Sequence, residues 1–282
     1  MPSQYSEITF AEQLSLFDEI ISWINSLGVE TSGTRVEKIR SILSQIVTSY
    51  NAEDYGSIFN HYSEAEVFYT LTDVTSYFKA YEVLKELRSH EIPRRKLLQI
   101  IEGPLLPADE SPSEGNTESR NILFELEVAW RVKERGYEIN NLDDVQFRHD
   151  SNEMNIQCKR VHSSRNVPHN VDNALRQYER RASDNPSLKG IIAIAIEKIT
   201  NTEDYIFECD SQEQIDTELD RLVNNFIEEH EENWGSLCDS GVVGVLVFVK
   251  FLAKQNQEPT PKLIVARNTT YYPTCRDLAI PL

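Results

Sequence analysis

The sequence predicts a mixed α/β protein with an all-α N-terminal region, and three observations lead to this class. Apolar residues recur with a period close to 3.6 through the first fifty residues, as on one face of a helix. A stretch rich in proline and small polar residues follows at 106–118, which is typical of a linker. Beyond it, helix-like and strand-like patterns alternate. We therefore expect a helical region at 1–105 and an α/β domain at 119–282, with a central sheet flanked by helices.

The N-terminal region carries three helical patterns. The first begins at Phe10 and stops at Gly28, because glycine is common just past a helix end. The second has Ser32 or Thr34 available as its cap. The third, rich in tyrosine and phenylalanine, covers about 64–87. These apolar stripes predict a helical core and indicate no function.

The α/β domain opens with an amphipathic helix that ends at Gly136. Two strand-like segments follow, VQFRHD and MNIQCKRV, on either side of the turn residues SNE. Next come a polar helix, VDNALRQYERRAS, and a short β-branched run, GIIAIAIEKI, which is typical of a buried strand. YIFEC then extends the sheet, an acidic helix covers 210–234, and two late strands are GVVGVLVFVKFLA and KLIVARN.

The charge is strongly acidic but unevenly distributed. Lysine and arginine number 28 against 46 aspartate and glutamate residues, which gives a net charge of −18. Residues 157–181 are an exception, because six basic side chains there accompany only Asp172 and Glu179. An acidic chain with one confined basic patch can bind a polyanion at that patch, while its other surfaces repel one. The alternative interpretation is a solvated helix face rich in arginine.

Several classes of protein are excluded by the sequence. No apolar stretch reaches the roughly 20 residues that a membrane-spanning helix needs, and the first residues lack the features of a secretory signal. The four cysteines are far apart and form no CxxC pair, so we expect neither a disulfide nor a zinc site. These features predict a protein of a reducing cytoplasm.

The residues that can carry chemistry gather around the two strands after the linker. Asp144 stands at the start of the first strand, and Gln157 and Lys159 lie two apart on the second, so their side chains share a face. The 13 positions from Asp144 to Gln157 suit a short antiparallel hairpin. On the preceding helix, Glu125 has mostly apolar neighbours, whereas Glu127 is expected to face solvent.

These residue types suit metal-assisted phosphodiester hydrolysis. The oxygen ligands of Asp144, Glu125 and Gln157 suit Mg²⁺, which polarises a phosphate and lowers the pKa of a bound water. Lys159 beside the metal would stabilise negative charge on the phosphoryl oxygens. The alternatives are that Asp143 and Asp144 cap a turn and that Lys159 is an ordinary cation at the end of a strand.

The aspartate, the string Gln157-Cys158-Lys159 and the surrounding helices and strand resemble the restriction-endonuclease-like, or PD-(D/E)xK, nuclease superfamily. The resemblance covers about residues 118–200, and the Gln-x-Lys form is similar to the Mrr-type members. It implies the restriction-endonuclease-like fold, with Asp144, Gln157 and Glu125 as ligands of Mg²⁺ or Mn²⁺. It also implies a catalytic role for Lys159 and for Glu125.

This chain departs from the family pattern in two ways. It has no proline before Asp144, and it lacks the glycine-rich string common around the aspartate in the Mrr-type members. Asp143 or Asp150 therefore remains open as the metal ligand. Because Gln157 stands in place of an acid, a nuclease-fold binding or scaffold protein without turnover is the alternative function.

The resemblance implies a nucleic-acid partner, DNA more than RNA, in prokaryotic antiviral defence or DNA processing. We expect Arg160, Arg176 and Arg180 to contact phosphates, since the last two lie four apart on one helix face. The alternative is that the two helix arginines pair with the acidic helix over 210–232. The helical N-terminal region suits a protein partner or a homodimer.

Overall fold

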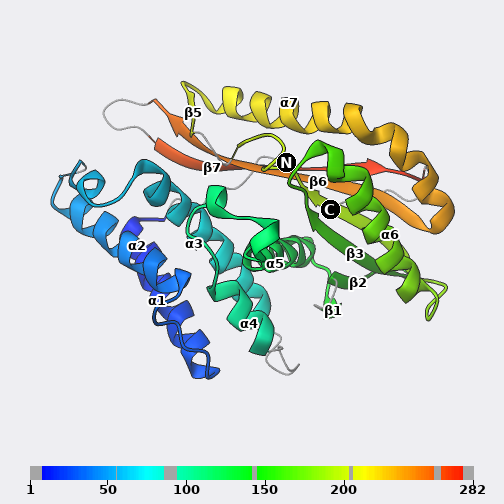
Figure 1. Ribbon diagram of the computed structural model, residues 1–282, viewed down its shortest axis with the longest axis horizontal. Coiled ribbons are helices and arrows are strands. Elements are labelled where there is room, and N and C mark those ends of the chain that lie inside the picture. Colours follow the sequence, from blue (N-terminus) through cyan, green and yellow to red (C-terminus); the bar gives the residue numbers. More distant parts are fainter. Residues whose placement is uncertain are drawn as a thin grey trace. The chain divides into compact units, whose positions relative to one another are not determined.

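Figure 1 shows the computed structural model, which describes residues 8–54, 56–85, 94–141, 145–202, 206–256 and 262–275. The chain divides into two compact units, Met1–Leu123 and Phe124–Leu282, and helix α5 (Glu118–Glu134) belongs in part to each. The first unit is helical, and the second is built on one mixed sheet flanked by helices. The predicted mixed α/β class with a helical N-terminal region is therefore confirmed.

The helices of the first unit follow the predicted patterns. Helices α1 (Phe10–Ser26), α2 (Arg35–Asn51) and α3 (Glu64–Leu84) lie where the apolar periods place them. Both α1 and α3 begin with a capping box, in which a hydroxyl and a glutamate side chain exchange hydrogen bonds with the backbone. The elements that the sequence does not predict are α4 (Arg94–Ile101) and the 3-10 turns η1 (Ser57–Asn60), η3 (Pro107–Asp109) and η4 (Pro112–Glu114).

A buried ion-pair network ties this unit together. Arg35 of α2 is 2% exposed and donates to the Ser119 hydroxyl of α5 at 2.8 Å. Arg120 pairs with Asp73 of α3 at 3.1 Å and with Glu110 at 3.0 Å. Glu110 belongs to the stretch predicted as a linker, so that stretch is packed into the first unit. Because removing one partner of a buried pair costs about 3–5 kcal/mol, the network specifies this packing.

The second unit holds a seven-stranded sheet over its described residues. Strands β1, β2 and β3 form an antiparallel meander, while β4 is parallel to both β3 and β6. β7 pairs antiparallel with one edge of β6. The other edge of β6 pairs in parallel with β4 along its first half and with β5 at its C-terminal end. The strands are β1 (Ile139–Asn141), β2 (Val145–His149), β3 (Asn152–Arg160), β4 (Lys189–Ala195), β5 (Ile206–Cys209), β6 (Val242–Gln255) and β7 (Lys262–Pro273).

Two connections of this sheet contain the predicted helices. Helix α6 (Val167–Ala182), preceded by η5 (Ser164–Asn166), links β3 to β4. Helix α7 (Gln212–His230), followed by η6 (Glu231–Ser240), links β5 to β6. None of the helices among the described residues is long and apolar enough to cross a bilayer.

The two faces of the sheet carry different helices. Lys159 of β3 pairs with Ile194 of β4, which pairs with Val247 of β6, so these three side chains share a face. Ile194 and Val247 belong to the buried cluster formed with α6 and α7. The next residue of β6, Phe248, points the other way and meets Phe124 of α5, with ring centroids 5.2 Å apart. We call these the α6 face and the α5 face.

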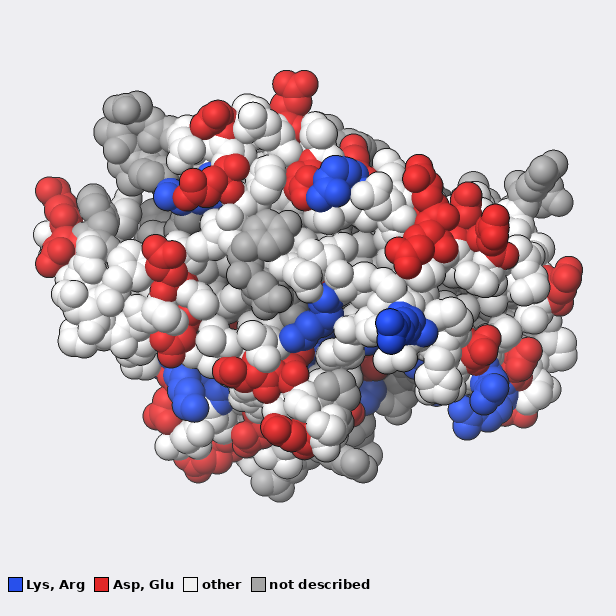
Figure 2. Space-filling model, turned by 45° about the horizontal axis from the view of Figure 1, so that its top comes forward, with Lys and Arg blue, Asp and Glu red and all other residues white. Residues whose placement is uncertain are grey.

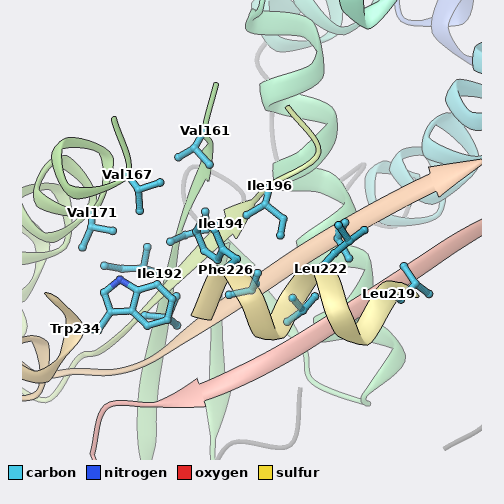
Figure 3. Packing of buried hydrophobic residues seen from close by; sticks show 14 of the residues in the cluster. Val161, Val167, Val171, Ile192, Ile194, Ile196, Leu219, Leu222, Phe226 and Trp234 are labelled. Atoms are coloured by element: carbon cyan, nitrogen blue, oxygen red, sulfur yellow. The ribbon is translucent and has the colours of Figure 1, made fainter. Parts of the chain in front are cut away.

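Branched aliphatic side chains fill the space between the sheet and its α6 and α7 helices (Figure 3). The strands contribute isoleucine and valine, which suit a sheet buried on both faces. The helices contribute residues at helical spacing, so one apolar stripe of each helix faces the sheet. The labelled members are Val161, Val167, Val171, Ile192, Ile194, Ile196, Leu219, Leu222, Phe226 and Trp234.

The expectation of no disulfide is wrong. Cys238 near the end of η6 and Cys275 beyond β7 are bonded, with their Cα atoms 5.4 Å apart and a separation of 37 positions in the sequence. The cause is the β6–β7 register, which pairs Gly244 with Pro273 and so brings the start of one strand beside the end of the other. Cys158 and Cys209 are free thiols.

Candidate functional site

A row of polar side chains runs along β3 on the α6 face. Glu153, Asn155, Gln157 and Lys159 occupy alternate positions, and the residues between them turn to the other face. Asn155 is 0% exposed and Gln157 is 1% exposed. A strand with neighbours on both sides and helices on both faces normally buries apolar residues. We call these four residues the β3 polar row, and their position marks them as the candidate site.

Lys159 lies at the far end of this row and is held by α6. Its ammonium donates to Oε1 of Gln177 at 2.6 Å. Sequence reasoning did not single out Gln177 as a site residue. The sequence does contain a pattern that could have identified Gln177. It lies three positions after Ala174 and next to Tyr178, and both of these are buried on the stripe of α6 that faces the sheet. A polar residue beside a buried stripe needs a polar partner, and Lys159 is that partner here.

The amide of Gln157 is oriented by its neighbour in the row. Its Nε2 donates to Oδ1 of Asn155 at 2.8 Å, which leaves the Gln157 carbonyl oxygen as the group available to a cation. The Asn155 Nδ2 is buried without a hydrogen-bond partner. A buried donor without an acceptor costs about 1–3 kcal/mol, so this end of the site favours a water or a substrate oxygen.

Helix α6 is fixed over the row by Tyr178. Its hydroxyl donates to the Leu188 carbonyl at 2.8 Å and to the Gly241 carbonyl at 3.3 Å. The ring lies against Gly190, where an added Cβ would come within 2.9 Å of it. Burial raises the pKa of the Tyr178 hydroxyl, which therefore stays protonated as a donor. Gln177, the preceding residue, is thereby held opposite Lys159.

The predicted aspartate ligands have different outcomes. Asp144 and Asp143 lie outside the described residues. Val145, which follows them, pairs with Ile156, the residue before Gln157. Asp150 lies in the β2–β3 turn with its side chain 84% exposed. The turn is at the opposite end of β3 from Lys159, about 23 Å away along the strand, so Asp150 cannot share a metal with that end of the row.

The two glutamates of α5 lie on a helix that packs against the other face of the sheet. Glu125 is half-buried there, and Gln157 and Lys159 point to the α6 face. Glu127 was expected to face solvent, and this is wrong: it is 6% exposed and pairs with Lys250 and Arg267. Both cations come from the sheet. The residues around Glu127 in its own helix therefore give no sign that it is buried and paired.

The three arginines that were predicted to contact phosphates do not all lie on the same face of the sheet. Arg160 is one position from Lys159 on β3, so strand alternation turns it to the α5 face. Arg176 and Arg180 are exposed on α6. In the described part of the chain neither forms an ion pair with α7, where Arg221 pairs with Glu218 of the same helix. Figure 2 shows acidic side chains over much of one face and only a few separate basic ones. On such a surface, an exposed arginine attracts an anion only in its immediate surroundings.

The candidate site thus offers a fixed ammonium, an oriented amide oxygen and an unused amide donor. Among the described residues, no three histidine, cysteine, aspartate or glutamate side chains gather as a metal-binding group. No family model matches the chain, and neither the curated proteins nor the solved structures contain a match. The function must therefore be inferred from the chemistry of the site.

Proposed function

We propose that the protein is a metal-dependent nuclease of the restriction-endonuclease-like fold, with its active site at the Lys159 end of the β3 polar row. The single observation that carries this proposal is the position of the Lys159 ammonium. Lys159 follows Gln157, whose amide is oriented by Asn155, by two positions on β3, and Gln177 of α6 holds its ammonium by a hydrogen bond. A cation fixed in a half-buried position can stabilise charge that develops on a phosphoryl oxygen without having to reorganise.

The topology supports the same proposal. The second unit runs α5, β1, β2, β3, α6 and β4, with three antiparallel strands followed by a parallel one. This order of helix, hairpin, helix and strand is what the resemblance of residues 118–200 implies. The β2–β3 register brings the chain just after Asp144 beside the residue before Gln157, as a shared site requires.

Each residue then has a distinct role. The Gln157 carbonyl and a carboxylate from Asp144 would hold a divalent cation, and Mg²⁺ is the metal that oxygen ligands suit. That cation would supply an activated water for the hydrolysis. Lys159 stabilises the phosphoryl oxygens and Gln177 positions Lys159. Glu125 is not needed for this assignment, because its helix packs against the opposite face of the sheet.

Exposed Arg176 and Arg180 support a nucleic-acid substrate, with DNA favoured over RNA by the resemblance. Both flank Gln177 on α6, so a backbone that they hold would pass close to Lys159. Contacts of this kind are mostly sequence-independent, because they are made to phosphates. We propose that the substrate lies along α6 and away from the acidic helix α7.

The experiment is a cleavage assay on the full chain. Labelled duplex DNA, single-stranded DNA and RNA are incubated with Mg²⁺, with Mn²⁺ or with EDTA. The proposal predicts cleavage with a metal and none with EDTA. If no substrate is cut with either metal, the nuclease assignment is wrong.

A binding or scaffold protein with a nuclease fold is the second candidate. It is favoured by one observation, the 1% exposure of Gln157 and its engagement with Asn155. Under this reading the wild-type protein binds no divalent cation at the β3 polar row. Calorimetric titration with Mn²⁺ separates the two candidates, since only the nuclease predicts metal binding that is lost on substitution of Gln157 by leucine.

A further inference from the structure

A second polar cluster lies on the α5 face, opposite the β3 polar row. Glu127 of α5 lies between Lys250 of β6 and Arg267 of β7, with nitrogen-to-oxygen distances of 3.5 Å and 3.6 Å. Lys250 and Arg267 are register partners on the two strands. Arg131 follows Glu127 by one helical turn, and Thr269 follows Arg267 by two residues on the same face of β7. We call these five residues the Glu127 cluster.

The Glu127 cluster carries an excess of positive charge. Three cations accompany one carboxylate, so the cluster has a formal charge of +2. Burial lowers the pKa of the Arg131 guanidinium; the charges of Glu127 and Glu134 act against this shift, and those of Arg267 and Arg135 add to it. The cations therefore repel one another in a partly desolvated place, and additional negative charge would stabilise them.

The cluster also holds hydrogen-bond donors that have no acceptor. Nε and Nη2 of Arg267 and the hydroxyl of Thr269 are buried without hydrogen-bond partners. Nε of Arg267 faces Oε1 of Glu127 at 3.6 Å, which is longer than the 2.7–2.9 Å of a strong charge-assisted hydrogen bond. Glu127 therefore balances charge at Nε, while Nη2 of Arg267 and the Thr269 hydroxyl remain unused donors. An anionic acceptor would satisfy these donors and offset the positive charge in the same place.

Solvent can reach this cluster. The side chain of Lys250 is 27% exposed and that of Arg267 is 17% exposed. Its members come from α5, β6 and β7 of the second unit alone, so the site is complete within that unit. The buried donor groups of Arg267 therefore belong to a side chain whose other atoms reach solvent.

We propose that the Glu127 cluster is a binding site for a phosphate group. A phosphate carries about −1.5 to −2 charges at neutral pH and several acceptor oxygens, which match the excess charge and the unused donors. Arginine is well suited to such a group, because its planar guanidinium presents two parallel donors. The site lies on the opposite face from Lys159, so it is separate from the proposed active site and does not depend on nuclease activity.

The test is phosphate-dependent thermal stabilisation of the full chain. The melting temperature is measured with inorganic phosphate, and with sodium chloride at the same ionic strength. Arg267→Met removes the donors and the charge at similar size, and Thr269→Val removes only the hydroxyl. Arg221→Met is the matched control, because Arg221 is an exposed arginine of α7 that pairs with Glu218.

Phosphate should raise the melting temperature of the wild type and of Arg221→Met more than chloride does. Arg267→Met should weaken phosphate binding at least about tenfold, and Thr269→Val severalfold, in line with the loss of one charged and one neutral hydrogen-bonding group. A wild type that responds to phosphate as to chloride would overturn the proposal. So would a phosphate response that both Arg267→Met and Thr269→Val retain, and the second variant decides the matter if the first does not fold.

The source of the phosphate group is resolved by two further titrations, a nucleoside triphosphate and a short oligonucleotide in EDTA. Binding of inorganic phosphate and of the nucleotide, both lost in Arg267→Met, supports a free small molecule as the ligand. Binding of the oligonucleotide alone, lost in the same variant, supports a backbone phosphate. Binding that none of the variants changes would place the anion elsewhere and contradict the assignment.

Discussion

The two faces of the central sheet handle polar groups in opposite ways. On the α6 face, the β3 polar row buries two neutral amides and keeps its cation, Lys159, hydrogen-bonded to Gln177. On the α5 face, Glu127 is buried and pairs with Lys250 at 3.5 Å and with Arg267 at 3.6 Å. On the first face the Gln157 amide and the Lys159 ammonium are oriented by neighbouring side chains, and one buried donor, Nδ2 of Asn155, is left over. The second has charge and donors left over, which is the property of a site that a bound anion completes.

The largest effect that this comparison predicts follows from removing the charge of Glu127. Glu127→Gln leaves three cations together without their carboxylate, so we expect a loss of about 3–5 kcal/mol in the free energy of unfolding. Urea denaturation in a phosphate-free buffer measures it. Added phosphate should recover part of the loss. A variant as stable as the wild type would show that the cations do not depend on Glu127.

On the α6 face the corresponding test adds a buried charge instead of removing one, by Gln157→Glu. A carboxylate at this 1% exposed position is costly without a cation, so the metal-free variant should melt below the wild type. Each kcal/mol corresponds to about 2–4 °C in a chain of this size. Mg²⁺ or Mn²⁺ should then raise the melting temperature of the variant more than that of the wild type. An equal response of the two proteins would mean that no metal binds beside residue 157.

The surface of α6 offers a smaller effect. Arg176 and Arg180 are exposed, so Glu substitutions of both should leave the melting temperature nearly unchanged. Nucleic-acid affinity should fall for all sequences alike, and its dependence on salt should become flatter because fewer counterions are released. Fluorescence anisotropy at several salt concentrations measures both quantities. A lower melting temperature without a loss of affinity would favour a structural role for the two arginines.

The smallest effect concerns pH and His230, at the end of α7. Burial lowers the pKa of its imidazole, while Glu229 acts weakly in the opposite direction. The folded state therefore favours the neutral ring, and stability is unaffected above the ordinary pKa near 6.5. Below it the unfolded chain takes up a proton that the folded chain resists, so stability falls. His230→Gln should flatten the stability profile below about pH 6.5, as followed by urea denaturation.

Much of the fold could be predicted because periodicity is a local property. The 3.6-residue stripes predict α1, α2, α3, α5, α6 and α7, and the β-branched runs predict β4 and β6. The three residues of β1 are too few to show a pattern. The Cys238–Cys275 disulfide depends on the β6–β7 register, a long-range property that cysteine spacing does not contain.

For the candidate site, too, the sequence predicts the local features and misses those that depend on tertiary packing. Alternation along a strand correctly places Gln157 and Lys159 on one face, because the period of two is fixed by the backbone. Which helix covers that face is a matter of tertiary packing, so spacing alone could not show that Glu125 lies on a helix of the other face. Glu127 was misjudged for the same reason, since its partners Lys250 and Arg267 are more than a hundred residues away.

We propose that Lys159 on the α6 face stabilises the charge that develops during phosphodiester cleavage. The most direct measurement is the single-turnover rate of metal-dependent DNA cleavage by Lys159→Ala, with Lys254→Ala as the matched control. Lys254 forms an exposed pair with Glu208, and its loss should have little effect. We predict that Lys159→Ala lowers the rate about 10²–10³-fold while the protein stays folded, as expected for a group that stabilises developing charge; loss of the hydrogen bond to Gln177 should lower the melting temperature only slightly. If Lys159→Ala cuts at the rate of the control, Lys159 is not catalytic and the proposed active site is wrong.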